Sequence, residues 1–370
     1  MHCKKVKALD AKRFWRNFEN DDRALIYNPN SKELIIGAKK STTRNKYMFC
    51  FMPFSKNSMN EEWSGLATNG VSFEYYLKVT KGDTLLYYNK EYTFNEKKEE
   101  KYDNVYEFKM PDFEEWKKVF GKVKHEINNG KIKKVVLSQR LEFEGSRSID
   151  SWAILDKLME DNPQSYTFAH QKGNKIFLGS TPEILVEKRG NKILSYALAG
   201  TVSKDEMDGD KRGNWLLNDA KNKYEHRLVV DKIVNIIGDV ANNIEIGDME
   251  LLELKKLYHL KTSIKAENSS LGIMDWVKLL HPTPAMGGEP RKDAVELIKK
   301  CEKHDRGLFA APLGIVDEQG DGIFVVGIRS ALIQEKRGFA YAGCGIVERS
   351  ECRAEYDEIN NKLQTILEAL

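Results

Sequence analysis

The end of the chain reads as two apolar segments joined by a short charged turn, and this pattern limits the fold more than any other feature. Residues 322–334 and 338–347 are apolar, and the sequence Glu-Lys-Arg at 335–337 separates them. Strands that pair across so short a turn are antiparallel, because a parallel pair needs a long crossover connection. We therefore predict an antiparallel hairpin here, followed by a closing helix over about residues 353–370.

Upstream of this hairpin, predicted strands and helices alternate irregularly. Asp112 is the expected N-cap of a helix that Gly130 ends. Hairpins beside long helices, rather than regular βαβ units, favour antiparallel sheets covered by helices, an α+β arrangement. The other predicted strands are 47–51, 84–88, 133–141, 166–170, 175–178 and 184–187, and the other helices are 149–160 and 218–237. A charge-dense stretch at 95–101 is typical of a solvated hairpin tip or connection.

Composition excludes several classes of protein. The 370 residues are ample for a large core, and 59 basic against 56 acidic residues give a net charge of only +3, so neither nucleic acid nor a membrane surface is an expected partner. Five scattered cysteines without a Cys-x-x-Cys pair indicate no disulfide framework and no zinc site. The charged start and the lack of any long apolar run predict a cytoplasmic protein.

The closing helix places two carboxylates and one ammonium on a single face. Glu355, Glu358 and Lys362 are spaced i, i+3 and i+7. Such a face is either a solvated set of ion pairs or half of a site for a metal and a carboxylate. Just before it, Gly343 and Gly345 predict a Gly-x-Gly turn where the backbone can approach a ligand closely.

Other chemically capable residues stand in short islands, and each has an ordinary interpretation. Lys134 opens an apolar strand and could be an edge gatekeeper. Glu183 follows Pro182 before a strand, and Glu225 lies inside a helix, so either could be merely solvated. His259 has the surroundings of an interior histidine. Arg329 interrupts an apolar strand and, if buried, would need an anionic partner.

In their order along the chain, these islands resemble the chorismate-utilising enzymes, which include isochorismate, salicylate, anthranilate and aminodeoxychorismate synthases. The match covers about residues 112–370, and residues 1–111 would be a divergent N-terminal portion of one chorismate-binding domain spanning 1–370. The motifs are Lys-Val-Val-Leu-Ser from 134, Ser-Thr-Pro-Glu from 180, Leu-Ala-Gly-Thr from 198, Glu-His from 225, His-Pro-Thr-Pro-Ala-Met-Gly-Gly from 281, Ile-Arg-Ser-Ala from 328, Ala-Gly-Cys-Gly-Ile-Val from 342 and Glu-x-x-Glu from 355.

The resemblance implies two packed, mainly antiparallel sheets covered by helices in α/β/β/α layers. It also implies a Mg²⁺ cofactor held by Glu225 and Glu358, with Asn222 and Glu355 as outer partners. Asn222 departs from the family pattern, which has Asp or Glu there, so we expect weakened Mg²⁺ affinity. The residues that would contact the substrate, chorismate, are Gly200, Thr201, His259, Ala285, Phe309, Arg329, Ala342, Gly343 and Lys362.

Within the family, Lys134 indicates water rather than ammonia as the nucleophile, with Lys134 as general base and Glu183 as general acid. These roles require a depressed lysine pKa and a raised glutamate pKa. The implied reaction is the reversible, Mg²⁺-dependent isomerisation of chorismate to isochorismate, by addition of water at C2 with loss of the C4 hydroxyl. The enzyme would feed menaquinone biosynthesis and act as a monomer, with no obligatory glutaminase subunit.

Three alternatives stay open at this point. A salicylate synthase would go on to eliminate pyruvate, although the position of Phe309 is often tyrosine in those enzymes. An ammonia-dependent synthase would work with a glutaminase, and a silent chorismate-binding protein would lack turnover. Siderophore supply could replace menaquinone as the destination. Residues 201–214, rich in Asp, Lys and Gly, are expected to form a mobile loop over the pocket.

Overall fold

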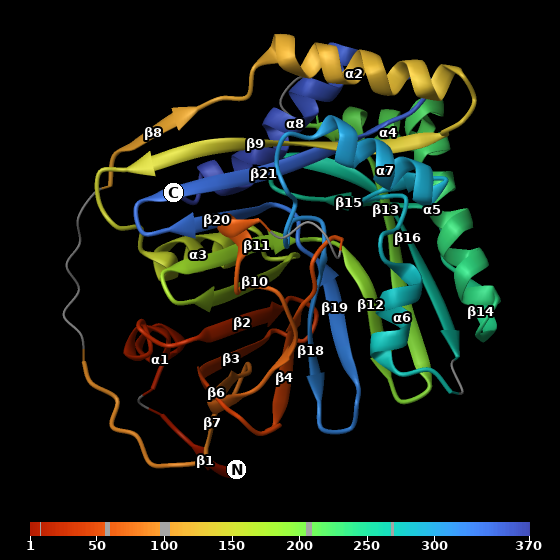
Figure 1. The fold of residues 1–370 in the computed structure, drawn as a ribbon. Helices are drawn as coiled ribbons and strands as arrows, with labels where there is room; N and C mark the ends of the chain where they lie inside the picture. The colour runs from red at the N-terminus through yellow and green to blue at the C-terminus, as the bar shows by residue number, and fades with distance from the viewer. Residues whose placement is uncertain (8, 56–59, 97–103, 205–208, 268–269) are drawn as a thin grey trace.

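Two large antiparallel β-sheets pack together with helices around them in the computed structural model (Figure 1). The structure describes residues 1–370 except 8, 56–59, 97–103, 205–208 and 268–269. Most of the charge-dense stretch at 95–101 lies outside these described residues, as does the middle of the expected loop at 201–214. The predicted α+β class, with two packed antiparallel sheets covered by helices, is confirmed.

The larger sheet has twelve strands in the described part of the chain, and their order is far from their order in the sequence. Its path runs β1, β7, β6, β3, β2, β10, β11, β20, β21, β9, β17, with β8 also on β9. The bounds are β1 (His2–Lys5), β2 (Arg23–Asn28), β3 (Glu33–Lys40), β6 (Phe73–Val79), β7 (Thr84–Tyr88), β8 (Tyr106–Lys109), β9 (Lys134–Gly145), β10 (Tyr166–Lys172), β11 (Lys175–Thr181), β17 (Gly288–Glu289), β20 (Ser330–Gln334) and β21 (Arg337–Ile346).

The second sheet has nine strands among the described residues, and in Figure 1 its strands cross the direction of the larger sheet. Its path runs β14, β16, β13, β12, β19, β18, β4, β5, with β15 also on β16. Both sheets therefore include strands from residues 1–111. The bounds are β4 (Tyr47–Phe51), β5 (Thr68–Val71), β12 (Ile184–Arg189), β13 (Lys192–Ser203), β14 (Asn242–Ile246), β15 (Glu250–Glu253), β16 (Leu257–Glu267), β18 (Pro312–Asp317) and β19 (Gly322–Val326).

The predicted C-terminal hairpin is confirmed in its second half, and the prediction for its first half is wrong. Strands β20 and β21 pair antiparallel across the short turn, as predicted. The segment 322–334 is not one strand, however, because β19 belongs to the second sheet and β20 to the larger one. Arg329 stands at the break with φ +50°. An apolar run can cross from one packed sheet to the other without losing burial, so hydrophobicity alone does not reveal the break.

Helices cover the sheets, and the four predicted helices are present as α2, α3, α5 and α8. Asp112 caps α2 by accepting hydrogen bonds from the backbone N–H groups of Glu114 and Glu115. Asp150 and Asp219 cap α3 and α5 in the same way. The bounds are α1 (Ala11–Asn17), α2 (Phe113–Asn128), α3 (Ser151–Asp161), α4 (Gly209–Asn218), α5 (Ala220–Gly238), α6 (Ile273–Leu280), α7 (Arg291–Cys301), α8 (Cys352–Leu367) and the 3₁₀ helix η1 (Glu61–Trp63).

The Gly-x-Gly segment before α8 is a strand and not the predicted turn. Gly343 and Gly345 continue β21 and pair with Ser138 and Val136 of β9. The expected loop at 201–214 is also partly wrong, because its described ends belong to β13 and α4. In both segments glycine and polar residues suggested a loop, but tertiary contacts keep the backbone in regular structure.

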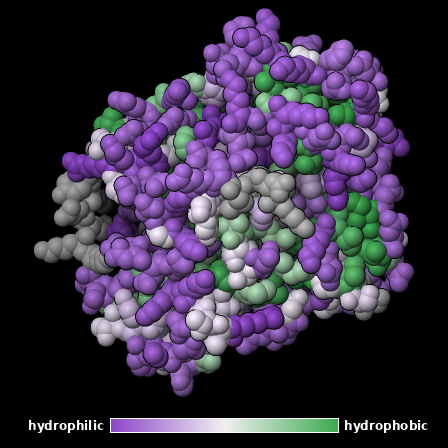
Figure 2. Space-filling view, viewed as in Figure 1, coloured by the Kyte–Doolittle hydropathy of each residue, from purple (hydrophilic) through white to green (hydrophobic). Residues whose placement is uncertain are grey.

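Hydrophilic residues cover most of the face shown in Figure 2. The core lies between the sheets and beneath the helices, and includes large side chains such as Trp63, Trp276 and Tyr341. None of the helices in the described part of the chain combines the length and the apolar character that a membrane crossing requires.

Candidate functional site

One small cavity, of about 60 Å³, gathers side chains from distant parts of the chain. Strands β9, β13 and β21 and helices α5 and α8 all contribute to its lining. Every residue predicted to contact substrate or metal, or to act as acid or base, lines it. These are Lys134, Glu183, Gly200, Thr201, Glu225, His259, Ala285, Phe309, Arg329, Ala342, Gly343, Glu358 and Lys362.

Lys134 and Glu225 form a buried ion pair at one end of this cavity. Their Nζ and Oε1 atoms are 3.0 Å apart, and the lysine side chain is 1% exposed. The gatekeeper interpretation of Lys134 is thus wrong, because β17 covers that edge of β9 and the side chain points inward. Burial would raise the pKa of Glu225, but the ammonium groups of Lys134 and Lys221 outweigh it and lower the pKa to about 2.

Glycine at position 345 makes room for this pair. A Cβ there would lie 2.1 Å from Glu225 Oε1 and 2.7 Å from Lys134 Cε. Both distances are far below contact, so any other residue at 345 would displace the charged pair. The close backbone approach expected from the Gly-x-Gly sequence therefore does occur, within a strand.

Glu183 is a buried carboxyl on the short connection between β11 and β12. Its side chain has almost no exposure, and its backbone carbonyl accepts a hydrogen bond from the N–H of Val326 in β19. Burial raises the pKa of Glu183 to about 8, although the positive charges of Lys134 and Lys362 oppose the shift. A carboxyl with this pKa is protonated at neutral pH and can donate a proton.

Arg329, His259 and Thr201 form a hydrogen-bonded chain at another part of the wall. Arg329 Nη2 lies 2.9 Å from His259 Nε2, and His259 Nδ1 lies 2.9 Å from Thr201 Oγ1. A guanidinium has no acceptor, so His259 Nε2 accepts the hydrogen bond from Arg329. His259 Nδ1 therefore carries the imidazole proton and donates a hydrogen bond to Thr201 Oγ1. Burial first, and then the charges of Arg329 and Lys362, lower the pKa of His259 well below its usual value.

The guanidinium of Arg329 thus has neutral partners, and no carboxylate in the described part of the chain contacts it directly. Burial lowers its pKa to about 10, which still leaves it charged at neutral pH. A buried cation that faces a cavity and contacts only neutral groups favours an anionic ligand.

Backbone strain is concentrated in the same wall. Arg329 and Ala310 both line the cavity, and both are non-glycine residues in the left-handed region, with φ of +50° and +57°. That conformation costs roughly 1–2 kcal/mol for an L-residue. Strained backbone at a cleft is typical of functional sites, where surrounding structure enforces the geometry.

Lys362 and Glu358 project from α8 toward β21. Lys362 Nζ lies 2.6 Å from Glu358 Oε1 and donates to the carbonyl oxygen of Gly343 at 2.9 Å. The closing helix therefore turns its charged face toward the cavity and not toward solvent. The solvated face, one of the two interpretations of the i, i+3, i+7 spacing, is therefore wrong.

Asn222 and Glu355, predicted as outer partners, are buried but do not line the cavity. Asn222 donates through Nδ2 to Asp219 Oδ1 at 2.7 Å. Lys221 of α5 also belongs to this group, and the sequence reasoning missed it. Its Nζ is 2.8 Å from Glu355 Oε1. Its position four residues before Glu225, one helical turn away, was the signal that could have identified it.

The oxygen atoms around this group suit a hard cation such as Mg²⁺. Among the described residues, Asn222 Oδ1 and Glu355 Oε2 are buried and have no hydrogen-bond partner, and Glu225 and Glu358 line the cavity. The described residues contain no cluster of three or more acidic, histidine or cysteine side chains placed to hold a metal by themselves. Mg²⁺ commonly uses one or two carboxylates with water and substrate oxygens, so the donor set fits that ion.

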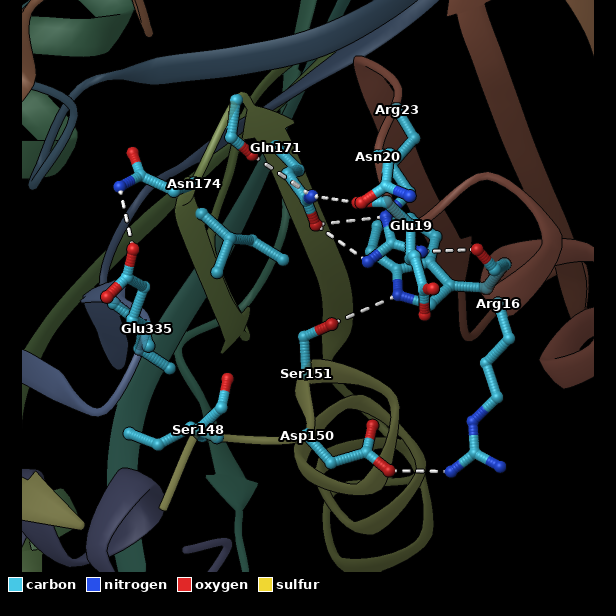
Figure 3. Close-up of a pocket in the computed structure, with 15 residues that line it drawn as sticks. Arg16, Glu19, Asn20, Arg23, Ser148, Asp150, Ser151, Gln171, Asn174 and Glu335 are labelled. Carbon is cyan, nitrogen blue, oxygen red and sulfur yellow. Dashed lines mark hydrogen bonds and ion pairs between the residues drawn. The ribbon is translucent and has the colours of Figure 1, made fainter. Parts of the chain in front are cut away.

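A second cavity is far larger, about 650 Å³, and differs in character. It is a cleft beside α1 and α3, and Figure 3 shows its polar side chains facing one another. Arg16 Nη2 lies 2.6 Å from Asp150 Oδ2, and Asn174 donates to Glu335 at 3.2 Å. None of the predicted site residues lines this cleft.

Comparison with known proteins identifies the family. The family model described as chorismate binding enzyme matches residues 74–370. This chain belongs to the chorismate binding enzyme family. The predicted resemblance is therefore confirmed, and the match extends further toward the N-terminus than residue 112.

Relatives in this family include proteins with named activities. A salicylate biosynthesis isochorismate synthase of Pseudomonas aeruginosa is 40% identical over 248 residues, which are 66% of this chain and 52% of that protein. An isochorismate synthase of Bacillus subtilis is 38% identical over 265 residues, 70% of this chain and 56% of that protein. The matched region thus spans about half the length of these two relatives.

Solved structures share the fold over nearly the whole chain. A putative 2,3-dihydroxybenzoate-specific isochorismate synthase from Bacillus anthracis has a TM-score of 0.80 at 25% identity, covering 97% of this chain and 98% of that one. The menaquinone-specific isochorismate synthase of Escherichia coli has a TM-score of 0.83 at 22% identity, covering 99% and 94%. At such identity, the second likeness establishes the fold alone.

Proposed function

We propose that this protein is an isochorismate synthase, an isomerase that interconverts chorismate and isochorismate. The observation that carries the proposal is the presence of Lys134 and a protonatable Glu183 in the lining of one cavity. The family relatives named as isochorismate synthases support it. Water adds at C2 of the ring, the C4 hydroxyl leaves as water, and the double bonds shift, so the formula of the substrate is unchanged.

Two side chains would move the protons. Lys134 would first release the proton of the ammonium group that pairs with Glu225, and its neutral amine would then accept a proton from the water that attacks C2. Glu183 would donate its proton to the departing C4 hydroxyl. A pKa of about 8 keeps the Glu183 proton available at neutral pH. After one turnover Lys134 carries an extra proton and Glu183 lacks one. Release of a proton from Lys134 to solvent and uptake of a proton by Glu183 restore the reactive state.

Two cationic side chains would hold the substrate, which is a dianion. Arg329 presents a guanidinium that contacts the neutral His259, and we propose that it binds the carboxylate of the enolpyruvyl group. Lys362 would face the substrate carboxylates from α8. The Arg329–His259–Thr201 chain fixes the arginine through hydrogen bonds, so it need not reorient when the anion arrives.

Mg²⁺ is the proposed cofactor, and Glu225 and Glu358 would hold it from two different helices. Bound there, Mg²⁺ would supply positive charge to the ring carboxylate of chorismate and orient the ring. Asn222 Oδ1 and Glu355 Oε2, both buried and without a hydrogen-bond partner in the described part of the chain, would accept hydrogen bonds from the water around it.

Product analysis tests the proposal directly. The protein is incubated with chorismate and Mg²⁺, and the products are separated by chromatography. Isochorismate alone supports the proposal. Salicylate with pyruvate would make the protein a salicylate synthase, anthranilate or aminodeoxychorismate formed from added ammonia would make it an ammonia-dependent synthase, and no turnover would indicate a silent binding protein.

The finer proposals concern the setting of the reaction. We propose that the enzyme is a cytoplasmic monomer that works without a glutaminase subunit and supplies menaquinone biosynthesis. Sedimentation of the purified protein tests the monomer, and a pull-down that recovers a glutaminase would contradict the second point. Deletion of the gene in its host should lower menaquinone; an unchanged menaquinone level with loss of a catechol or salicylate siderophore would contradict the pathway.

A further inference from the structure

Lys221 joins the two helices that carry the proposed metal carboxylates. It lies in the first turn of α5, and its Nζ is 2.8 Å from Glu355 Oε1 on α8 and 3.5 Å from Glu225 Oε2 on its own helix. The side chain is 19% exposed, while both glutamates are nearly inaccessible. No motif of the sequence analysis included this lysine.

The charges around it alternate in sign. Lys134 contacts one oxygen of Glu225, Lys221 contacts the other, and Lys221 continues to Glu355. Buried carboxylates without positive partners are strongly destabilising. In this arrangement every oxygen of Glu225 already faces an ammonium group before any metal is considered.

We propose that Lys221 is an internal counter-cation that competes with Mg²⁺ for Glu225 while it pairs with Glu355. This inference rests on the proposed function, because it assumes that Glu225 holds the metal. Mg²⁺ binds carboxylate oxygens at about 2.0–2.1 Å. An ammonium group 3.5 Å from Glu225 Oε2 repels a dication bound at that oxygen, and the low polarity of a buried site strengthens the repulsion. Lys221 thus stabilises the metal-free protein and weakens its affinity for the metal.

A purely structural role for Lys221 leads to a different expectation. A lysine that only connects α5 to α8 would change stability when removed, but would leave metal affinity unchanged or weaken it by loosening the site. A competing lysine, when removed, makes metal binding tighter. The direction of the change in Mg²⁺ affinity therefore separates the two roles.

The test compares Lys221→Met with Lys223→Met on the purified full chain, without chorismate. Lys223 lies on the same helix and is exposed, so it is a matched control. We expect Lys221→Met to lower the melting temperature of the metal-free protein and to lower the Mg²⁺ dissociation constant by about tenfold in calorimetric titration. Lys223→Met should match the wild type in both measurements.

Two further variants guard against a folding defect. Lys221→Arg keeps the charge and should bind Mg²⁺ with the affinity of the wild type, which is weaker than that of Lys221→Met. Glu355→Gln in the Lys221→Met background removes the uncompensated carboxylate and should restore part of the lost melting temperature. A Lys221→Met protein that remains folded but binds Mg²⁺ equally or more weakly than the wild type overturns the competition.

The outcomes also separate this inference from the proposed function. If the wild type binds Mg²⁺ and Lys221→Met does not change the affinity, only the role of Lys221 is wrong. If neither the wild type nor Lys221→Met binds Mg²⁺ at millimolar concentrations, the metal assignment to Glu225 and Glu358 fails, and the inference fails with it.

Discussion

Two of the cavities among the described residues differ in a way that their sizes do not suggest. The cleft beside α1 holds about 650 Å³, and polar pairs such as Arg16 with Asp150 lie at its wall, where water screens their charges. The cavity between α5, α8 and β9 holds only about 60 Å³, yet its ionisable groups are buried and several have displaced pKa values. Burial and displaced pKa values, rather than volume, distinguish the cavity in which we propose that the reaction takes place.

Removal of the proposed base from the small cavity should have the largest effect on activity. Lys134→Ala should reduce kcat by about 10²–10⁴-fold, the usual contribution of a positioned acid or base. It should also lower stability, because Glu225 keeps its buried charge with one partner fewer. Steady-state isochorismate formation and thermal melting measure the two effects. A folded Lys134→Ala variant with full activity would remove the general-base assignment.

Replacement of the proposed acid should have the second-largest effect on activity. Glu183→Gln should lower kcat by about 10²-fold or more. In the wild type, kcat/KM should fall as pH rises through about 8, where Glu183 of the free enzyme loses its proton. The residual activity of Glu183→Gln should lack that descending limb. If the limb persists unchanged in the variant, another group is responsible for it.

The same carboxyl gives a prediction for stability with a definite sign. Its pKa is about 8 in the folded protein against 4.5 for an ordinary glutamate, so between these values the folded chain keeps a proton that the unfolded chain releases. This group therefore lowers the free energy of unfolding as pH rises from about 4.5 to 8. Denaturant titrations across that range should show a smaller decline for Glu183→Gln than for the wild type. An equal decline would contradict the raised pKa.

A smaller effect is expected when the charge near the proposed Mg²⁺ position is changed. Asn222→Asp adds a negative charge beside the proposed Mg²⁺ position and should lower the Mg²⁺ concentration for half-maximal rate by several-fold. The maximal rate should change little. Unchanged metal dependence would show that Asn222 does not act on the metal through its buried, unpartnered oxygen.

The smallest effect should come from the large cleft. Arg16→Ala removes a partly exposed ion pair with Asp150 and should change stability by no more than about 1 kcal/mol. It should leave kcat and KM for chorismate unchanged, so it serves as the reference for all the variants above. A large loss of activity in Arg16→Ala would mean that the cleft communicates with the buried cavity.

Local pattern predicted many elements of the fold but not their assignment to sheets. Strands 47–51 and 84–88 and the helix capped by Asp112 follow from local residues, and the structure contains them. The segment 322–334 shows the limit of this reasoning. Its hydrophobicity is continuous, and only the packing of one sheet on the other decides that the chain changes sheets at Arg329.

The sequence by itself determined the family, the α+β class and the set of residues that meet in one cavity, because those residues stand in motifs with fixed order. It could not determine which charges are buried or what they contact. Glu225 looked like a surface residue, Lys134 like an edge lysine, and Lys221 was not noticed at all. Burial and pairing of charge depend on segments about 90 to 130 residues apart that only the folded sheets bring together. The same contacts set the pKa values on which the proposed chemistry depends.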